Sequence, residues 1–371
     1  MKIQSAVING VNEDFKLTDM ILDDPQAGEV LVKMVASGIC HTDATVKDGT
    51  MPIPFPAVLG HEGSGIVESV GDGVTNFKKG DHVVVGFASC GECQFCRSGM
   101  PGACERFSEL NMGGAMRDGS HRIHTEDGQD ASVFFGQSSF STYSVVQENN
   151  LVKVDDSMDL RLLGPLGCGF MTGSGTVLNS LSPEPGSSLV VFGTGAVGLA
   201  GMMAGVISNA THIIAVDINP ERLEIAKSLG ATETINSAEV DPVEEIMAIT
   251  GGKGAQYALD TTGVPAVINS AIKSLAIKGE LATVAVGKKP VEVDFTNDIV
   301  TFSRTIKGVI EGDAIPQELI PKLVEFYNKG QFKIDEISKL YAFSDINQAF
   351  EDSKKGVTVK PVVVIDESYS A

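Results

Sequence analysis

Three residues that lie far apart in the sequence, Cys40, His61 and Cys168, have the side chains that bind a catalytic zinc ion. Zinc at a catalytic site commonly keeps three protein ligands and one open position, where a water or a substrate oxygen binds and is polarised. Two thiolates and one imidazole meet this requirement. Each of these residues alone is more often a member of a hydrophobic core than a ligand, so the interpretation depends on their neighbours.

The neighbours of Cys40 and His61 favour catalysis. Cys40 is followed directly by His41, Thr42 and Asp43, and His61 by Glu62. A carboxylate such as Asp43 can hold a ligating imidazole in one tautomer, and a threonine hydroxyl can take a proton from a bound alcohol. These residue types predict an enzyme.

The other four cysteines, Cys90, Cys93, Cys96 and Cys104, lie within one short segment. Closely spaced cysteines in an intracellular chain are typical of a closed, tetrahedral structural zinc site. The alternative is four unrelated thiols. Because a closed site has no open position, we assign the loop 90–104 to stability and not to chemistry.

A glycine-rich turn, 193–198, has the surroundings of a dinucleotide-binding site. It follows a short apolar strand at 187–192 and precedes an apolar segment, 199–207, that reads as a helix. A second strand, 212–216, then ends at Asp217. A G-x-G-x-x-G motif alone is weak, but this order of strand, turn, helix, strand and acid is the one that binds NAD or NADP.

Each residue of this fingerprint has a mechanical role. Gly193 permits the tight turn, Gly195 lets the backbone approach the pyrophosphate, and Gly198 lets the helix pack closely on the strand. A carboxylate at Asp217 can accept the ribose hydroxyls and would repel a 2′-phosphate, which favours NAD. Arg222 could reach such a phosphate, although we expect it over the adenosine ribose.

The sequence around these motifs predicts two domains. Short strands at 28–35, 65–70 and 82–85 make the first part β-rich, whereas strands and helices alternate from 187 to 309. The remainder returns with helices at 319–329 and 345–350 and a strand at 359–365 to complete the first domain. The polar segment 108–136 is expected to be a solvated loop; a metal site at its two histidines, His121 and His124, is the less favoured alternative.

Length and charge exclude several classes of function. The chain has 371 residues and a formal net charge of −20, which disfavours nucleic acid and anionic membranes as partners. No run of about 18 apolar residues is present, and the N-terminus lacks the pattern of a signal peptide. We expect a cytoplasmic protein.

The motifs together resemble the zinc-dependent medium-chain alcohol dehydrogenases, in which a Cys2His ligand set for catalytic zinc is the known arrangement. The resemblance covers the whole chain and rests on Gly60-His61-Glu62, the four-cysteine loop, the segment 164–168 and the glycine-rich turn, which occur in the family's order. Cys40-His41-Thr42 and the polar segment after the cysteine loop are similar to the aryl-alcohol (benzyl alcohol) dehydrogenases.

The resemblance implies an α/β fold with a β-rich GroES-like catalytic domain, 1–170 and 311–371, and a Rossmann NAD-binding domain, 171–310. It implies two zinc ions and NAD as cofactors. The implied roles are zinc binding by Cys40, His61 and Cys168, support from Asp43 and Glu62, proton transfer by Thr42, and phosphate contacts by His41 and Lys360. Many relatives carry a histidine soon after the relay hydroxyl, whereas this chain has Ala44-Thr45-Val46, so the relay must end in the ribose, in water or in Thr45.

The implied reaction is the reversible oxidation of a primary aromatic alcohol to its aldehyde by a homodimer or homotetramer. Met51, Phe55 and Phe140 are candidates for an apolar substrate pocket, although each could equally be a core residue. One alternative is a general primary alcohol or a glutathione adduct of formaldehyde as substrate, against which the apolar segment 51–55 argues. A non-catalytic NAD-binding protein is the alternative of another class.

Overall fold

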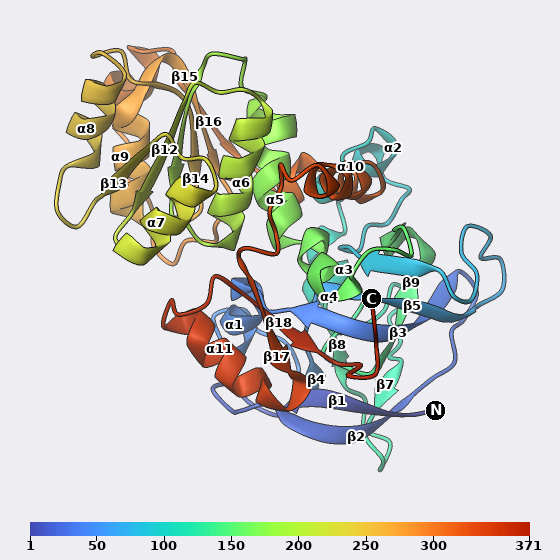
Figure 1. Ribbon diagram of the computed structural model, residues 1–371. Coiled ribbons are helices and arrows are strands. Elements are labelled where there is room, and N and C mark those ends of the chain that lie inside the picture. The colour runs from blue at the N-terminus through green and yellow to red at the C-terminus, as the bar shows by residue number, and fades with distance from the viewer. The chain divides into compact units, whose positions relative to one another are not determined.

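The computed structural model describes residues 1–371, which form two compact units (Figure 1). Unit 1 consists of Met1–Cys168, Ile315–Lys322 and Ile334–Ala371, and unit 2 of Gly169–Ala314 and Leu323–Lys333. The segment Leu323–Lys333, which we expected in the first domain, packs with unit 2. The exact domain boundaries stay a proposal, since helix α10 (Pro316–Asn328) contributes residues to both units.

Unit 1 is mainly antiparallel β-structure. Its strands are β1 (Lys2–Ile8), β2 (Lys16–Leu22), β3 (Glu29–Gly38), β4 (Ala57–Val58), β5 (Gly63–Val70), β6 (His82–Val85), β7 (Ile123–His124), β8 (Ser132–Val133), β9 (Tyr143–Gln147), β10 (Leu151–Lys153), β17 (Ser338–Ala342) and β18 (Lys360–Val364). Its helices are α1 (His41–Lys47), α2 (Gln94–Arg97), α3 (Phe107–Met112), α4 (Leu160–Leu163) and α11 (Ile346–Lys354).

Strand β3 organises the larger sheet of unit 1, whose strand order is β10-β6-β5-β3-β18-β17, with β9 also paired to β3. Nine of its ten residues are buried, which explains why it is the clearest strand in the sequence. β18 pairs antiparallel with the end of β3, so the last part of the chain completes the first sheet, as predicted. A second sheet has the order β7-β2-β1-β4-β8.

Unit 2 is a six-stranded sheet with the order β13-β12-β11-β14-β15-β16, in which every neighbouring pair is parallel. Helices α8 and α9 cover one face and α5 and α6 the other (Figure 1). The strands are β11 (Ser188–Phe192), β12 (His212–Asp217), β13 (Glu233–Asn236), β14 (Ala255–Asp260), β15 (Leu275–Thr283) and β16 (Thr305–Gly308). The helices are α5 (Gly169–Gly175), α6 (Ala196–Ile207), α7 (Pro220–Ser228), α8 (Pro242–Ile249) and α9 (Pro265–Ser274), and α5 continues into a π-helical segment, Thr176–Leu181.

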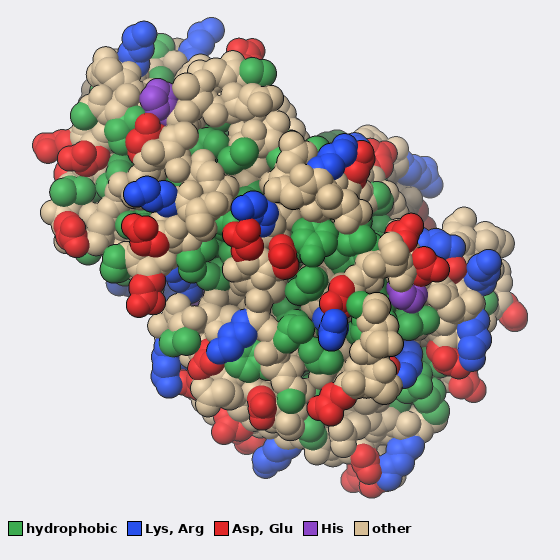
Figure 2. Space-filling model, in the orientation of Figure 1, with side chains coloured by type: hydrophobic (Ala, Val, Ile, Leu, Met, Phe, Trp, Pro, Cys, Tyr) green, Lys and Arg blue, Asp and Glu red, His purple; other side chains and the backbone are tan.

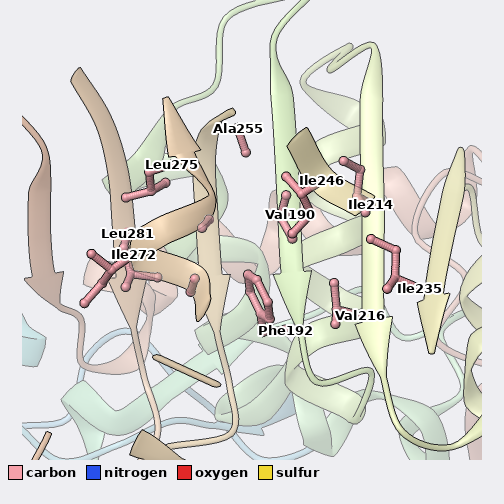
Figure 3. Packing of buried hydrophobic residues seen from close by; sticks show 12 residues of the cluster. Val190, Phe192, Ile214, Val216, Ile235, Ile246, Ala255, Ile272, Leu275 and Leu281 are labelled. Carbon is pink, nitrogen blue, oxygen red and sulfur yellow. The ribbon is translucent and has the colours of Figure 1, made fainter. Parts of the chain in front are cut away.

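The core of this sheet comes from apolar residues on neighbouring strands, with Ile246 of α8 and Ile272 of α9 packed against Val190, Ile214 and Leu281 (Figure 3). Burial of one such side chain contributes about 1.5–3 kcal/mol to stability. All five residues of β11 are buried, as a strand covered on both faces requires. The predicted Rossmann architecture is confirmed.

Some elements depart from the prediction. Helix α1, strand β13 and helix α8 were not predicted. The segment 108–136 is not a solvated loop throughout: Arg122 within it is 2% exposed and pairs with Glu29 at 2.9 Å. His124 lies between the carboxylates of Asp23 and Asp130, so the alternative of a metal site with His121 has no support.

The surface carries its charge in a dispersed form. Figure 2 shows acidic side chains scattered over the visible face and interspersed with lysine and arginine, without a single-sign patch. None of the helices has the length and apolar character needed to cross a membrane.

Candidate zinc centres and cofactor site

The ligand atoms of Cys40, His61, Glu62 and Cys168 come together in unit 1, all within 4.8 Å of one another. Cys40 lies between β3 and α1, His61 between β4 and β5, and Cys168 follows a short helical turn. His61 and Glu62 are fully buried, and Cys168 is 7% exposed. Cys168 lies more than a hundred positions after Cys40 and His61 in the sequence, yet all three form one cluster, as the predicted catalytic zinc site requires.

Asp43 orients the imidazole of His61. Its Oδ1 lies 3.0 Å from His61 Nδ1 and accepts the backbone N–H of Gly60 at 3.1 Å, while its Oδ2 accepts that of Cys40 at 3.0 Å. With Nδ1 occupied, Nε2 is left to bind a metal, and this buried atom has no hydrogen-bond partner. An orphaned ring nitrogen beside two thiols fits zinc, because a buried polar atom without any partner is otherwise costly.

The electrostatics of this cluster also suit a metal. A hydrogen bond from Cys168 and the positive field of His61 hold the pKa of Cys40 well below that of an ordinary thiol, which favours the metal-binding thiolate. Burial by itself would lower the pKa of His61, but the neighbouring Asp43 and Cys40 raise it well above its usual value. A metal binds Nε2 of His61 only in its unprotonated form, so metal affinity at this cluster is expected to depend on pH.

Lys360 has a different position from the one expected. It is 2% exposed, and its ammonium donates to both carboxylate oxygens of Glu62, at 2.7 and 2.9 Å, and to the carbonyl of Ile39 at 3.2 Å. Burial would lower the pKa of Lys360, but Glu62 raises it. The structure thus gives Lys360 a role in neutralising Glu62, and its contact with a cofactor phosphate stays a prediction.

The two residues after Cys40 lie at the first turn of α1, whose N-terminus Asp43 caps through the bond to Cys40 N. The Cys40 thiol lies 3.7 Å from the hydroxyl of Thr42, which is half-buried, while His41 is exposed. The hydroxyl of Thr45 donates to the carbonyl of Thr42 at 2.7 Å. Because its proton is already committed there, Thr45 is a poor end point for the proton relay.

Two aromatic residues next to His61 were not identified from the sequence. The ring of Phe135 stacks on the imidazole at 4.5 Å between centroids, and Phe134 meets it edge-on at 5.4 Å. Phe107 in turn contacts Phe135 edge-on at 6.4 Å. The paired phenylalanines before Gly136 are the only sequence signal for this wall, and they are ambiguous because aromatic residues are common in every core.

The three residues expected to line the substrate pocket differ in their burial. Phe140 is fully buried and packs edge-on against Phe15 and Phe350, so it belongs to the core and is not a pocket residue. Met51 and Phe55 are half-buried in the segment between α1 and β4 and stay candidates.

The four cysteines of the loop 90–104 also lie close together in the structure. The Sγ atoms of Cys90, Cys93, Cys96 and Cys104 lie within 4.8 Å of one another. Backbone N–H groups of the loop point at the sulfurs, for example Cys93 N to Cys90 Sγ and Cys90 N to Cys104 Sγ, both 3.3 Å. No cysteine of the chain forms a disulfide. Four thiols with amide donors suit a closed tetrahedral zinc.

The glycine-rich turn of unit 2 has the predicted form. Gly193 has a φ of 88°, which favours glycine, and a Cβ on Gly198 would lie 1.9 Å from the carbonyl oxygen of Gly193. The turn borders a cavity of about 570 Å³. Asp217, Ile218, Ser237 and Val264 are among the residues that line this cavity, whose size suits part of a dinucleotide.

Asp217 lies at the end of β12 with both carboxylate oxygens engaged. One accepts the N–H and the hydroxyl of Thr194, each at 2.7 Å, and the other accepts Ile218 N and Asn219 N at 2.8 and 2.9 Å. These bonds fix the carboxylate at the cavity wall. Arg222 Nη1 lies 3.4 Å from the place of a Cβ on Gly195, so the guanidinium lies at the phosphate turn.

Replacement of Asp43 by asparagine is expected to lower zinc affinity at the first cluster about tenfold to a hundredfold. In either orientation, the amide NH2 of asparagine would face a backbone N–H, of Gly60 or of Cys40. Zinc retention against a chelator measures the effect. Asp48→Asn, at the exposed end of the same helix, is the control, and equal retention by both variants would contradict this role for Asp43.

Comparison with known proteins gives two family matches. Residues 26–156 match the alcohol dehydrogenase GroES-like domain, and residues 196–329 match the zinc-binding dehydrogenase family. A geraniol dehydrogenase of Castellaniella defragrans is 42% identical over 97% of each chain. A probable S-(hydroxymethyl)glutathione dehydrogenase of Schizosaccharomyces pombe is 39% identical over 97% of this chain and 96% of that one.

Solved structures agree with these matches. The benzyl alcohol dehydrogenase of Acinetobacter calcoaceticus has a TM-score of 0.94 at 45% identity and covers 98% of this chain and 99% of its own. An alcohol dehydrogenase zinc-binding domain protein of Burkholderia ambifaria has a TM-score of 0.97 at 44% identity, with 99% and 100% covered. The chain therefore belongs to the zinc-dependent medium-chain alcohol dehydrogenase family, whose members use NAD and two zinc ions.

Proposed function

We propose that this enzyme interconverts a primary aromatic alcohol and its aldehyde, with Cys40, His61 and Cys168 as the catalytic zinc ligands. The observation that carries the proposal is the assembled ligand set, in which the ligand atoms of Cys40, His61 and Cys168 all lie within 4.8 Å of one another. The benzyl alcohol dehydrogenase among the similar structures supports the same substrate class.

When bound, zinc supplies a Lewis acid for the alcohol oxygen and NAD supplies the hydride acceptor. The chain's own residues prepare the site. Asp43 fixes the imidazole of His61, and the pair of Glu62 and Lys360 places a neutralised carboxylate within 4.8 Å of the three ligand atoms. The burial of His61 and Glu62 keeps water away from this side of the cluster, where electrostatic interactions are consequently stronger.

Thr42 is proposed to take the proton of the alcohol. Its side chain is half-buried, and its hydroxyl lies 3.7 Å from the sulfur of Cys40. Since Thr45 already donates its proton to the Thr42 carbonyl, the relay is proposed to continue through the cofactor ribose or solvent. His41 is proposed to contact the cofactor phosphates, which its exposed position at the first turn of α1 permits.

An allylic alcohol is the second candidate substrate, because the similar geraniol dehydrogenase acts on one. The glutathione adduct is disfavoured, because the apolar segment 51–55 offers no charge for its carboxylates. A non-catalytic role is disfavoured by the complete ligand set.

The proposal is tested by comparing kcat/KM for benzyl alcohol, geraniol, ethanol and S-(hydroxymethyl)glutathione at saturating NAD, with the zinc content verified. We expect benzyl alcohol to exceed ethanol by at least about tenfold, since burial of an aromatic ring contributes more than 1.4 kcal/mol. Preference for geraniol would move the assignment to the allylic class. Preference for ethanol or for the glutathione adduct would contradict it.

Replacement of Asp217 by alanine is expected to raise the KM for NAD about tenfold to a hundredfold with a small change in kcat, because charged hydrogen bonds contribute about 1.5–3 kcal/mol. Initial rates at varied NAD measure it. Glu221→Ala, on the neighbouring helix α7, is the control. An unchanged KM would show that Asp217 only braces the turn through Thr194.

We propose a homo-oligomer joined through unit 2, in the cytoplasm. Strand β16 is the unpaired end of its sheet, and Ile277, Ile306 and Ile310 are exposed, Ile277 to 73%. An open edge with apolar side chains is a site for pairing with a second copy. Ile306→Lys is expected to shift sedimentation toward a single chain of 39.0 kDa. Thr234→Lys, on the opposite edge strand β13, should not, and a dimer that survives Ile306→Lys would contradict this interface.

A further inference from the structure

The side chain of Gln137 holds the backbone on both sides of Glu62. Its Nε2 donates to the carbonyl of His61 at 3.0 Å, and its Oε1 accepts the N–H of Gly63 at 3.2 Å. Nε2 also donates to the carbonyl of Gly86 at 3.2 Å. Gln137 is 1% exposed, so all of these bonds are made away from water. One buried amide thus fixes the peptide segment that carries a predicted zinc ligand.

The loop around Gln137 has an unusual backbone conformation. Phe135 and Ser138 have φ values of 51° and 49°, in the left-handed region that such residues seldom adopt. The Ser138 hydroxyl donates to the carbonyl of Val58 at 2.7 Å and accepts the N–H of Phe134 at 3.0 Å. A backbone of this kind persists only where its surroundings determine it strongly, and such positions gather at functional sites.

Asn111 connects this loop to the four-cysteine loop. Its fully buried amide pairs with both the N–H and the carbonyl of Ala88, at 2.8 and 2.9 Å, and donates to Phe107 at 2.8 Å. Ala88 and Phe107 pack in the hydrophobic cluster that contains Cys90 and the other three cysteines. The carbonyl of Asn111 then accepts the N–H of Phe135, at 2.8 Å.

A continuous set of contacts therefore runs from the cysteine loop to the catalytic cluster. Asn111 fixes Phe135, whose ring stacks on His61, and Gln137 fixes the backbone of the same histidine. Together with Asp43 at Nδ1, these contacts restrain the imidazole at its edge, its face and its main chain. Together, these three contacts set the direction in which Nε2 of His61 points.

We propose that Gln137 is a positioning residue for the catalytic metal and that Asn111 makes the order of the four-cysteine loop a condition for its geometry. The inference rests on the proposed function only in taking Cys40, His61 and Cys168 as the ligands. The four-cysteine loop would then have a second role besides stabilising the fold. If the loop lost its order, Phe135 would no longer be held against the imidazole of His61.

The test uses the full chain with zinc kept in the cysteine loop and Co²⁺ exchanged into the other site, where its visible absorption reports the ligand geometry. Gln137→Met removes all three hydrogen bonds at similar volume, and Gln137→Glu keeps only the acceptor for Gly63. Asn111→Leu removes the link to Ala88. Asn150→Leu is the matched control, because Asn150 is a buried amide nearby whose side-chain atoms have no partner.

Both Gln137 variants are expected to shift the Co²⁺ absorption and to weaken metal binding at this site about tenfold to a hundredfold. Asn111→Leu should shift the absorption in the same direction, and Asn150→Leu should leave it unchanged. A folded Gln137→Met or Gln137→Glu protein with the wild-type spectrum and affinity would overturn the inference. Failure of the wild-type chain to bind Co²⁺ through Cys40 and Cys168 would instead overturn the proposed function.

Discussion

Replacement of Cys168 by alanine is expected to abolish alcohol oxidation and to remove one of the two zinc ions while the other is retained. Cys168 is one of the three proposed zinc ligands in the first cluster, and it also lowers the pKa of Cys40. With two ligands left, zinc would be held too weakly to stay bound at ordinary free concentrations. We expect a loss of at least about a thousandfold in kcat/KM, or more than 4 kcal/mol in transition-state stabilisation.

Zinc per chain, measured by atomic emission, and the rate of NADH formation together check this expectation. Ser174→Ala is the control, because it removes a buried polar atom of α5 that contacts only the carbonyls of its own helix. A Cys168→Ala protein that still oxidised alcohols with full zinc content would show that the metal has other ligands.

Replacement of Cys104 by alanine is expected to destabilise the protein strongly. Cys104 is 5% exposed, and its sulfur accepts the N–H of Cys90 in the core of the loop. A structural zinc contributes folding free energy directly, about 10–16 kcal/mol of apparent binding energy in zinc-finger peptides. Loss of even a third of that, about 3–5 kcal/mol, corresponds to a fall in Tm of roughly 7–20 °C for a unit of this size.

Differential scanning calorimetry measures the fall in Tm. Ser98→Ala, in the same loop but exposed and bonded only to backbone carbonyls, should retain the wild-type Tm and both zinc ions. If Cys104→Ala kept its Tm and lost zinc, the loop would have no structural role and the coupling through Asn111 would fail with it.

The sequence predicts the chemistry of the site well because that chemistry depends on residue type. Cysteine and histidine have few uses besides metal binding in such contexts, and the glycine turn needs glycine at Gly193 and Gly198 for steric reasons. A fully buried parallel strand such as β11 leaves an unbroken apolar run. These signals depend on residues that are close in the sequence, so they can be recognised from the sequence alone.

The contacts that the sequence did not predict are the ones that depend on tertiary packing. Lys360 looks like a phosphate ligand, but Glu62 lies beside it only because β18 returns to pair with β3. Phe140 and Phe135 are the same residue type, yet one faces Phe15 in the core and the other faces His61. Helix α1 has seven residues, too few for a periodic pattern.

Anomalous diffraction at the zinc edge, from crystals of the zinc-loaded protein, tests the central claim most directly. The account predicts two peaks per chain: one surrounded by the four sulfurs of the loop 90–104, and one about 2.3 Å from Cys40 and Cys168 Sγ and about 2.0 Å from His61 Nε2, with one position open to solvent or alcohol. A single peak, or a second peak without His61 among its ligands, would contradict it.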